Sequence, residues 1–125
     1  MRWTVMAVMA VMMVFLSGTA AAADEPAMTA EDLYGLCAGT DHVSVNSCRI
    51  YILGVTQGLA LGLSIADGKT KTGRSCVPSS VSAERLEEML KKKLEADLTA
   101  SPEHRSRDAA AFIARVLASS YPCAK

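Results

Sequence analysis

The sequence predicts an all-α fold, and three observations support this class. Apolar residues recur at helical spacing in segments that are separated by clusters of glycine, proline and serine. No segment alternates apolar and polar residues as a half-buried strand would. Four cysteines, Cys37, Cys48, Cys76 and Cys123, follow an apolar leader, and an even number after such a leader indicates disulfides. We therefore expect a small four-helix domain that is cross-linked by two disulfides.

The leader has the three parts of a secretory signal peptide. Arg2 provides the positive charge, residues 5–16 are apolar, and Ala21-Ala22-Ala23 offers a small-residue cleavage site. The alternative is a permanent membrane anchor, but an apolar stretch of about twelve residues is short of the roughly twenty that span a bilayer. We expect a signal peptide at 1–23 and a secreted domain at 24–125, with no stable membrane insertion after cleavage.

Composition has to be considered without the leader, which contains five of the seven methionines and the only tryptophan. Because Arg2 is the leader's one charge, 12 of the 13 basic residues and all 13 acidic residues belong to the domain. This balance argues against a nucleic acid or an anionic membrane as partner. The remaining aromatic residues are too scattered for a base-stacking platform. They are Tyr34, Tyr51, Phe112 and Tyr121.

The first two helices are predicted from their ends and their length. Thr29 and Asp32 have the spacing of a capping box, which predicts a first helix over Ala30–Ala38 that Gly39 terminates. Residues 40–47, which include Asp41 and Asn46, are predicted to form a polar loop. The long segment Ser47–Ala66 contains no breaker except glycine, so we expect it to be the second helix.

The second helix contains three glycines spaced four residues apart, Gly54, Gly58 and Gly62. This spacing places them on one side, where we expect a smooth groove that packs closely against another helix, together with the nearby Tyr51. Each glycine costs about 1 kcal/mol of helix propensity relative to alanine. Small residues at this spacing also occur in membrane helices that dimerise. Arg49, Gln57 and Asp67 limit the apolar stretch, so we favour a buried helix of a soluble domain.

The third helix follows an exposed loop. Residues 67–74 include two glycines and no apolar side chain. Ser79, Ser80 or Ser82 could cap a helix over Ala83–Leu98. Its buried stripe is predicted to consist of Leu86, Met89, Leu90, Leu94 and Leu98. Its solvent-exposed face would be supported by the pairs Glu87 with Lys91 and Glu88 with Lys92.

The fourth helix is predicted to begin at Ser101-Pro102, where a capping residue precedes proline at the first helical position. Tyr121-Pro122 would end it. Its buried side chains are predicted to be Ala109, Phe112, Ile113, Val116 and Leu117.

Four cysteines allow three disulfide pairings, and sequence alone does not choose among them. Helix geometry favours one. Cys37 ends the first helix and Cys48 begins the second, while Cys76 and Cys123 flank two antiparallel helices of similar length. We expect Cys37–Cys48 and Cys76–Cys123, worth roughly 3 and 4 kcal/mol in the chain-entropy estimate. Zinc and redox sites would need Cys-x-x-Cys, which is absent from the sequence.

No catalytic constellation is recognisable. His42 and His104 lie in no nucleophile or metal motif, and Glu84, Glu87 and Glu88 lie near a helix start, where the helix dipole favours acids. We expect no catalytic residue, no metal and no cofactor, and infer that the protein acts by binding.

The order of motifs resembles the Rap/Tai family of type VI secretion immunity proteins. The motifs are Leu33-x-x-x-Cys37, Cys48-x-x-Tyr51-x-x-Gly54-x-x-x-Gly58, Cys76-Val77-Pro78 and Tyr121-Pro122-Cys123. The resemblance implies a small, helical, often dimeric periplasmic protein that binds and blocks a peptidoglycan amidase injected by competing bacteria. The matching residues belong to the scaffold, so they indicate the fold more than the partner.

The effector would then be blocked by occlusion of its active-site groove. The long, polar loop that precedes Cys76 is the best candidate for insertion, through Asp67, Lys69, Lys71 and Arg74. A periplasmic stress chaperone is the alternative from another class, and an enzyme built from scattered residues comes third.

Overall fold

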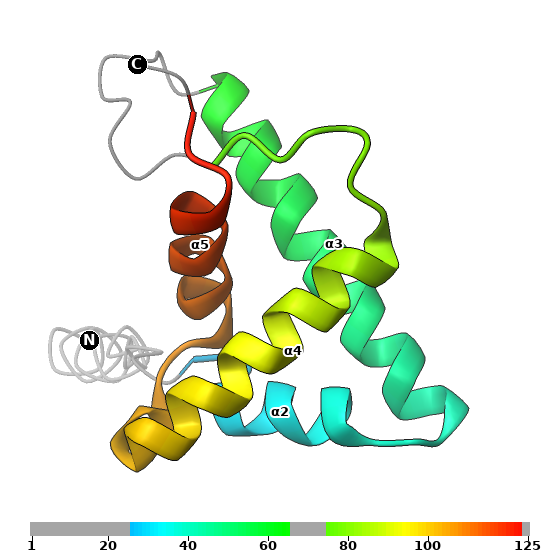
Figure 1. Ribbon diagram of the computed structural model, residues 1–125, viewed down its shortest axis with the longest axis vertical. Helices are drawn as coiled ribbons and strands as arrows, with labels where there is room; N and C mark the ends of the chain where they lie inside the picture. Colours follow the sequence, from blue (N-terminus) through cyan, green and yellow to red (C-terminus); the bar gives the residue numbers. More distant parts are fainter. Residues whose placement is uncertain (1–25, 66–74, 124–125) are drawn as a thin grey trace, which may run out of the picture.

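The computed structural model describes residues 26–65 and 75–123, and this part of the chain is helical. Its elements are α2 (Ala30–Ala38), α3 (His42–Ile65), α4 (Ala83–Ala100), the short 3-10 helix η1 (Pro102–Ser106) and α5 (Ala109–Ser120). In Figure 1, α4 crosses in front of the long helix α3, while α2 and α5 flank them. The described residues form no strand, only two isolated bridges. The predicted all-α fold with four α-helices is confirmed.

Helix α2 begins at the predicted capping box. The Asp32 N–H donates to Thr29 Oγ1 (3.1 Å), and the Thr29 N–H donates to Asp32 Oδ2 (3.0 Å). The same segment pairs with the start of α5, because the Ala30 N–H donates to the Arg107 carbonyl (2.8 Å) and the Ala109 N–H donates to the Met28 carbonyl (3.0 Å). The first turns of two helices that are far apart in sequence are thereby held side by side.

Helix α3 begins five residues earlier than predicted, at His42 rather than Ser47. The reason is Asp41, whose carboxylate accepts the N–H groups of Val43 (3.1 Å) and Ser44 (2.9 Å). A side chain that satisfies the free N–H groups of a first turn starts a helix there. The predicted polar loop over 40–47 is therefore wrong in most of its length, and only a short turn separates α2 from α3.

The predicted fourth helix is divided in two. Proline at position 102 starts the 3-10 helix η1, and the backbone at Arg107 is extended. Asp108 then caps a new helix, because its carboxylate accepts the Ala111 N–H (2.9 Å). The prediction of one helix from Pro102 onward is wrong because the extended backbone at Arg107 ends η1 and Asp108 caps a separate helix. Helix α5 ends at Ser120, next to the predicted stop.

Every α-helix packs its buried side into one hydrophobic core. The side chains that are at most 6% exposed are Ala30, Leu33, Cys37, Cys48, Ile52, Leu86, Leu90, Leu94, Leu98, Ala109, Phe112, Ile113 and Leu117. The predicted stripes of α4 and α5 are confirmed, with Met89 and Val116 only partly buried against the core. Helix α3 adds the partly buried Tyr51, Val55 and Leu59 on the same side as its buried residues.

Both predicted disulfides are present. Cys37 and Cys48 join α2 to α3 with Cα atoms 5.0 Å apart, and Cys76 and Cys123 join the chain before α4 to the chain after α5 with Cα atoms 4.9 Å apart. Cys48 is fully buried, at 0% exposed, whereas Cys76 is exposed. The two bridges therefore differ in their access to solvent.

This difference predicts the order in which the disulfides are reduced. Thiolate reductants need access to a sulfur atom, so a mild reductant should open Cys76–Cys123 first under native conditions. Alkylation followed by peptide mapping would follow both bridges. Loss of Cys76–Cys123 should then destabilise the domain by about 4 kcal/mol, since it closes the longer loop. Earlier opening of Cys37–Cys48 would contradict the burial described above.

The carboxylates at the first turns predict how stability depends on pH. Hydrogen bonds from Thr29 lower the pKa of Asp32, and hydrogen bonds from Ser44 lower the pKa of Asp41, both from an ordinary value of 3.8. Because the folded pKa lies below the unfolded one, this stabilisation is complete above about pH 5 and is lost as the pH falls through the folded pKa. Asp32→Asn/Asp41→Asn should unfold at lower urea concentration than wild type at pH 7.

The difference between the two proteins should become smaller as the pH falls through the folded pKa values, because the wild-type carboxylates then become neutral as well. Glu88→Gln, which removes an exposed carboxylate of α4, serves as the control and should follow the wild type throughout. A constant difference between wild type and the double variant at every pH would show that charge has no part in these caps.

Candidate functional site

The predicted effector-binding residues, Asp67, Lys69, Lys71 and Arg74, lie within 66–74, outside the described residues. The structure describes what holds the chain directly after them. The Cys76 N–H donates to the Tyr121 carbonyl (2.7 Å), Ser75 forms a bridge with Pro122, and Cys76 is bonded to Cys123. The chain that leaves this segment is thus fixed to the end of α5 by both a covalent bond and backbone pairing.

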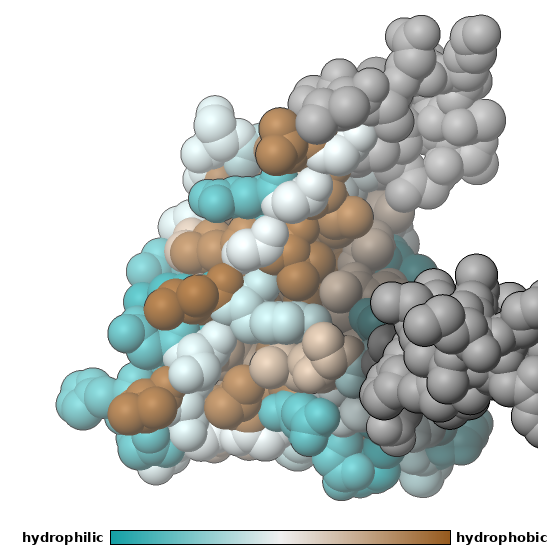
Figure 2. Space-filling view, turned by 180° about the vertical axis from the view of Figure 1, so that it is seen from behind, coloured by the Kyte–Doolittle hydropathy of each residue, from teal (hydrophilic) through white to brown (hydrophobic). Residues whose placement is uncertain are grey.

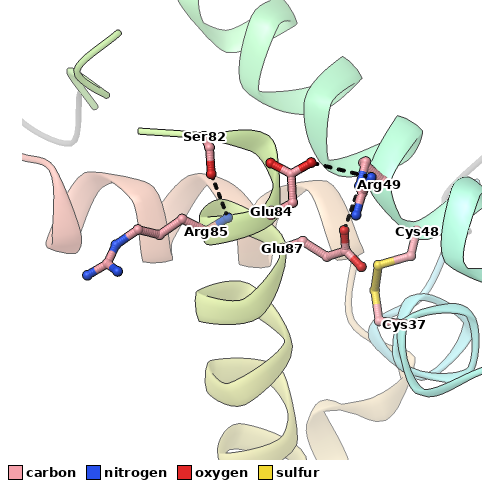
Figure 3. Close-up of polar contacts among 7 residues, drawn as sticks. All are labelled: Cys37, Cys48, Arg49, Ser82, Glu84, Arg85 and Glu87. Atoms are coloured by element: carbon pink, nitrogen blue, oxygen red, sulfur yellow. Dashed lines mark hydrogen bonds and ion pairs between the residues drawn. A yellow bond between two sulfur atoms is a disulfide. The ribbon is translucent and has the colours of Figure 1, made fainter. Parts of the chain in front are cut away.

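A polar cluster lies where α3 meets the N-terminal part of α4. Figure 3 shows Arg49 of α3 pointing toward Glu84 and Glu87 of α4, beside the Cys37–Cys48 disulfide. Arg49 Nε donates to Glu87 Oε2 (2.8 Å), and its Nη1 lies 3.5 Å from Glu84 Oε1. The Glu87 side chain is only 17% exposed, whereas that of Glu84 is 63% exposed. The ion pair with the less exposed carboxylate, Arg49–Glu87, therefore also has the shorter N–O distance.

The charges in this cluster stabilise one another. The hydrogen bond and negative charge of Glu87, with a smaller effect of Glu84, raise the pKa of Arg49. The pKa of Glu84 is lowered by its own N–H at the helix start, then by Arg49 and by the Ser82 hydroxyl. The cluster joins α3 to α4 through one guanidinium and two carboxylates. The predicted pair of Glu87 with Lys91 is wrong, because Glu87 is paired with Arg49 of α3 instead.

The two histidines lie apart. His42 is exposed at the start of α3, and His104 of η1 is partly buried with its Nδ1 2.9 Å from Asp97 Oδ2. This pair connects η1 to the last turns of α4. Across residues 26–65 and 75–123, no three His, Cys, Asp or Glu residues are grouped so that they could hold a metal ion.

The glycine stripe faces outward. Gly54, Gly58 and Gly62 are exposed, and a Cβ atom added at each would meet no described atom within 4 Å. The prediction that they pack against another helix of the chain is therefore wrong for the described residues. Tyr51 lies on the inner side, where partial burial and, to a smaller extent, the charge of Asp108 raise its pKa. The spacing located the stripe correctly, but it does not say which side of a helix faces the core.

Large apolar side chains accompany the glycines on the outer side of α3. Val43 is 75% exposed, Ile50 is 64% exposed and Leu61 is 62% exposed. Figure 2, which views the molecule from behind, shows brown hydrophobic patches separated by pale surface. Their spacing of seven and eleven positions places them on one side of a helix, but spacing does not show whether that side is exposed.

The Arg49 cluster predicts unequal coupling of its two ion pairs. Double-mutant cycles with Arg49→Gln, Glu87→Gln and Glu84→Gln should give a larger coupling energy for Arg49 with Glu87, because that pair is shorter and less exposed. The smaller coupling with Glu84 should also decrease more in high salt, since salt screens exposed charges more strongly. Urea unfolding would measure both. Equal coupling energies would show that burial does not distinguish the pairs.

Comparison with known proteins identifies the family. Residues 29–123 match the family model of the Rap1a immunity proteins. Searches against curated proteins and against solved structures returned no match. Among the described residues, no helix is long and apolar enough to cross a membrane. The family match covers both disulfides, the capping box and all the described helices, and the chain belongs to the Rap1a immunity protein family.

Proposed function

We propose that this protein is a periplasmic immunity protein that binds a secreted peptidoglycan amidase and blocks its active site. The observation that supports this most is the family match over residues 29–123, combined with a framework that two disulfides hold. Disulfides persist in oxidising compartments, of which the bacterial periplasm is one. The apolar leader, expected to be a signal peptide, agrees with that location.

Inhibition would occur by occlusion rather than by chemistry. A preorganised binder loses little conformational freedom on association, so more of its contact energy appears as affinity. In this protein the chain around the proposed contact segment is ordered on both sides, by α3 before it and by the Cys76–Cys123 bridge after it. We therefore keep Asp67, Lys69, Lys71 and Arg74 as the proposed contacts with the groove of the enzyme.

The test is inhibition of an amidase effector encoded next to this gene. Lys69→Ala/Lys71→Ala/Arg74→Ala should weaken inhibition and leave the helical circular dichroism spectrum unchanged. The matched control is Lys91→Ala/Lys92→Ala/Lys93→Ala, which removes the same charge from the polar face of α4, where Lys92 and Lys93 are exposed. The control should inhibit as the wild type does.

The rates of association and dissociation distinguish two ways in which the first triple variant could weaken inhibition. Loss of charges at the rim of an interface mainly slows association, whereas loss of desolvated contacts mainly speeds dissociation. Insertion into the groove therefore predicts faster dissociation by at least about tenfold, which corresponds to about 1.4 kcal/mol. If the first triple variant inhibited as the wild type does, the proposed segment would not contact the enzyme. Failure of the protein to bind any secreted hydrolase encoded next to its gene would contradict the immunity role.

A further inference from the structure

The two disulfides differ in their relation to the hydrophobic core. Cys37 and Cys48 belong to the core, at 6% and 0% exposed. Cys76 is exposed and Cys123 is only partly buried, so neither is among the buried side chains. The core therefore contains the first bridge, whereas the second bridge joins two segments at its surface.

Backbone contacts hold those two segments side by side independently of the sulfur atoms. The Cys76 N–H donates to the Tyr121 carbonyl (2.7 Å), and Ser75 forms an isolated bridge with Pro122. The partly buried side chains of Val77 and Tyr121 pack against the core. We expect these contacts to persist when the S–S bond is open, which would keep the two thiols close together.

The helices next to the second bridge also have attachments of their own. In Figure 3 the start of α4 is capped by Ser82 and connected to α3 by Arg49, which donates to Glu87 (2.8 Å). Helix α5 buries Ile113 and Leu117 completely, at 0% exposed. Packing of α4 and α5 therefore does not require the covalent bond between the chain before α4 and the chain after α5.

The separation of the cysteines along the chain indicates the order in which the bridges close. Cys37 and Cys48 are 11 residues apart, whereas Cys76 and Cys123 are 47 residues apart. A shorter loop closes at a lower entropic cost. The first pair is brought together by one short turn, but the second pair meets only after α4 and α5 have packed against each other. Once the core has formed, Cys48 is no longer accessible.

We propose that Cys76–Cys123 is closed last, on a domain that has already folded, by a thiol–disulfide oxidoreductase that reacts with Cys76. Attack in thiol–disulfide exchange requires access to a sulfur atom. Because Cys76 is exposed and Cys123 is partly buried, Cys76 is the site at which the mixed disulfide forms. Cys123, held beside it, is the thiol that resolves this mixed disulfide.

The exchange proceeds in two balanced steps. The Cys76 thiolate attacks one sulfur of the enzyme's disulfide, whose S–S bond breaks and whose other sulfur leaves as a thiolate. The Cys123 thiolate then attacks the Cys76 sulfur, so that the enzyme's first sulfur leaves as well. The two cysteines of this protein are thereby oxidised to one disulfide. The enzyme's disulfide is reduced to a dithiol, which takes up the two protons that the cysteine thiols lost.

The first test asks whether the domain folds without the second bridge. The full-length chain would be expressed with its leader as Cys76→Ala/Cys123→Ala and purified. This variant should keep the helical circular dichroism spectrum of the wild type and unfold cooperatively in urea. A variant without helical structure would overturn the proposal, because the second bridge would then be needed before the core forms.

The second test follows the order of closure in the wild-type chain. The protein would be reduced and unfolded, then returned to native conditions with glutathione disulfide, and samples would be alkylated at intervals and mapped as peptides. The main species with one disulfide should carry Cys37–Cys48 and show helical circular dichroism. Accumulation of a species that carries only Cys76–Cys123 would overturn the proposed order.

The third test identifies the reacting sulfur with a matched pair of variants. Cys123→Ser leaves the Cys76 thiol alone, and Cys76→Ser leaves the Cys123 thiol alone, while both variants retain Cys37–Cys48. In native buffer, Cys76 should form a mixed disulfide with glutathione disulfide at least about tenfold faster than Cys123, because attack requires access. In concentrated urea the two rates should become similar. A native Cys123 that reacts as fast as Cys76 would overturn the assignment of the site.

The last test concerns the class of partner. The folded wild type with Cys76–Cys123 selectively reduced would be mixed with a bacterial oxidoreductase of the thioredoxin fold in its disulfide form, or with the same concentration of glutathione disulfide. The oxidoreductase should close the bridge at least about tenfold faster, with its own disulfide reduced in equal amount. Equal rates would show that a small disulfide is sufficient and would overturn the role of a protein partner. These measurements use no effector, so they do not depend on the proposed function.

Discussion

Burial of one apolar side from each helix in a single small core is the constraint on which the rest of the structure depends. Leu33, Ile52, Leu94 and Ile113 come from four different helices, and none of them is more than 1% exposed. A domain of this size leaves a large share of its surface exposed to water and gains limited stability from its core. The disulfides support the core from two ends, and Cys48 at 0% exposed is itself part of it.

The same constraint explains why α3 has two different sides. It has 24 residues, against 9 in α2, 18 in α4 and 12 in α5. The other described helices cover one side of it, and no described residue covers Gly54, Gly58 and Gly62 on the opposite side. These glycines therefore weaken the helix without improving the packing among the described residues.

Much of the fold followed from sequence, because the features that decide it are local. The capping box and the stripes of α4 and α5 depend on spacing along single helices, and the cysteine pairing depends on which helix ends consecutive helices bring together; all were predicted correctly. The errors arose where one side chain decides between two helix starts. Asp41 and Asp108 each cap a helix. A single aspartate in a polar segment has no characteristic spacing to other residues that would predict a cap there.

The site was less predictable because its geometry depends on contacts between helices. Arg49 pairs with Glu87, which is 38 residues away in sequence. No residue pattern within α3 or within α4 predicts that contact. The inward or outward direction of the glycine stripe is likewise fixed by where the large residues pack. Spacing alone shows that Gly54, Gly58 and Gly62 share a side, but only the burial of Cys48 and Ile52 shows that this side is the outer one.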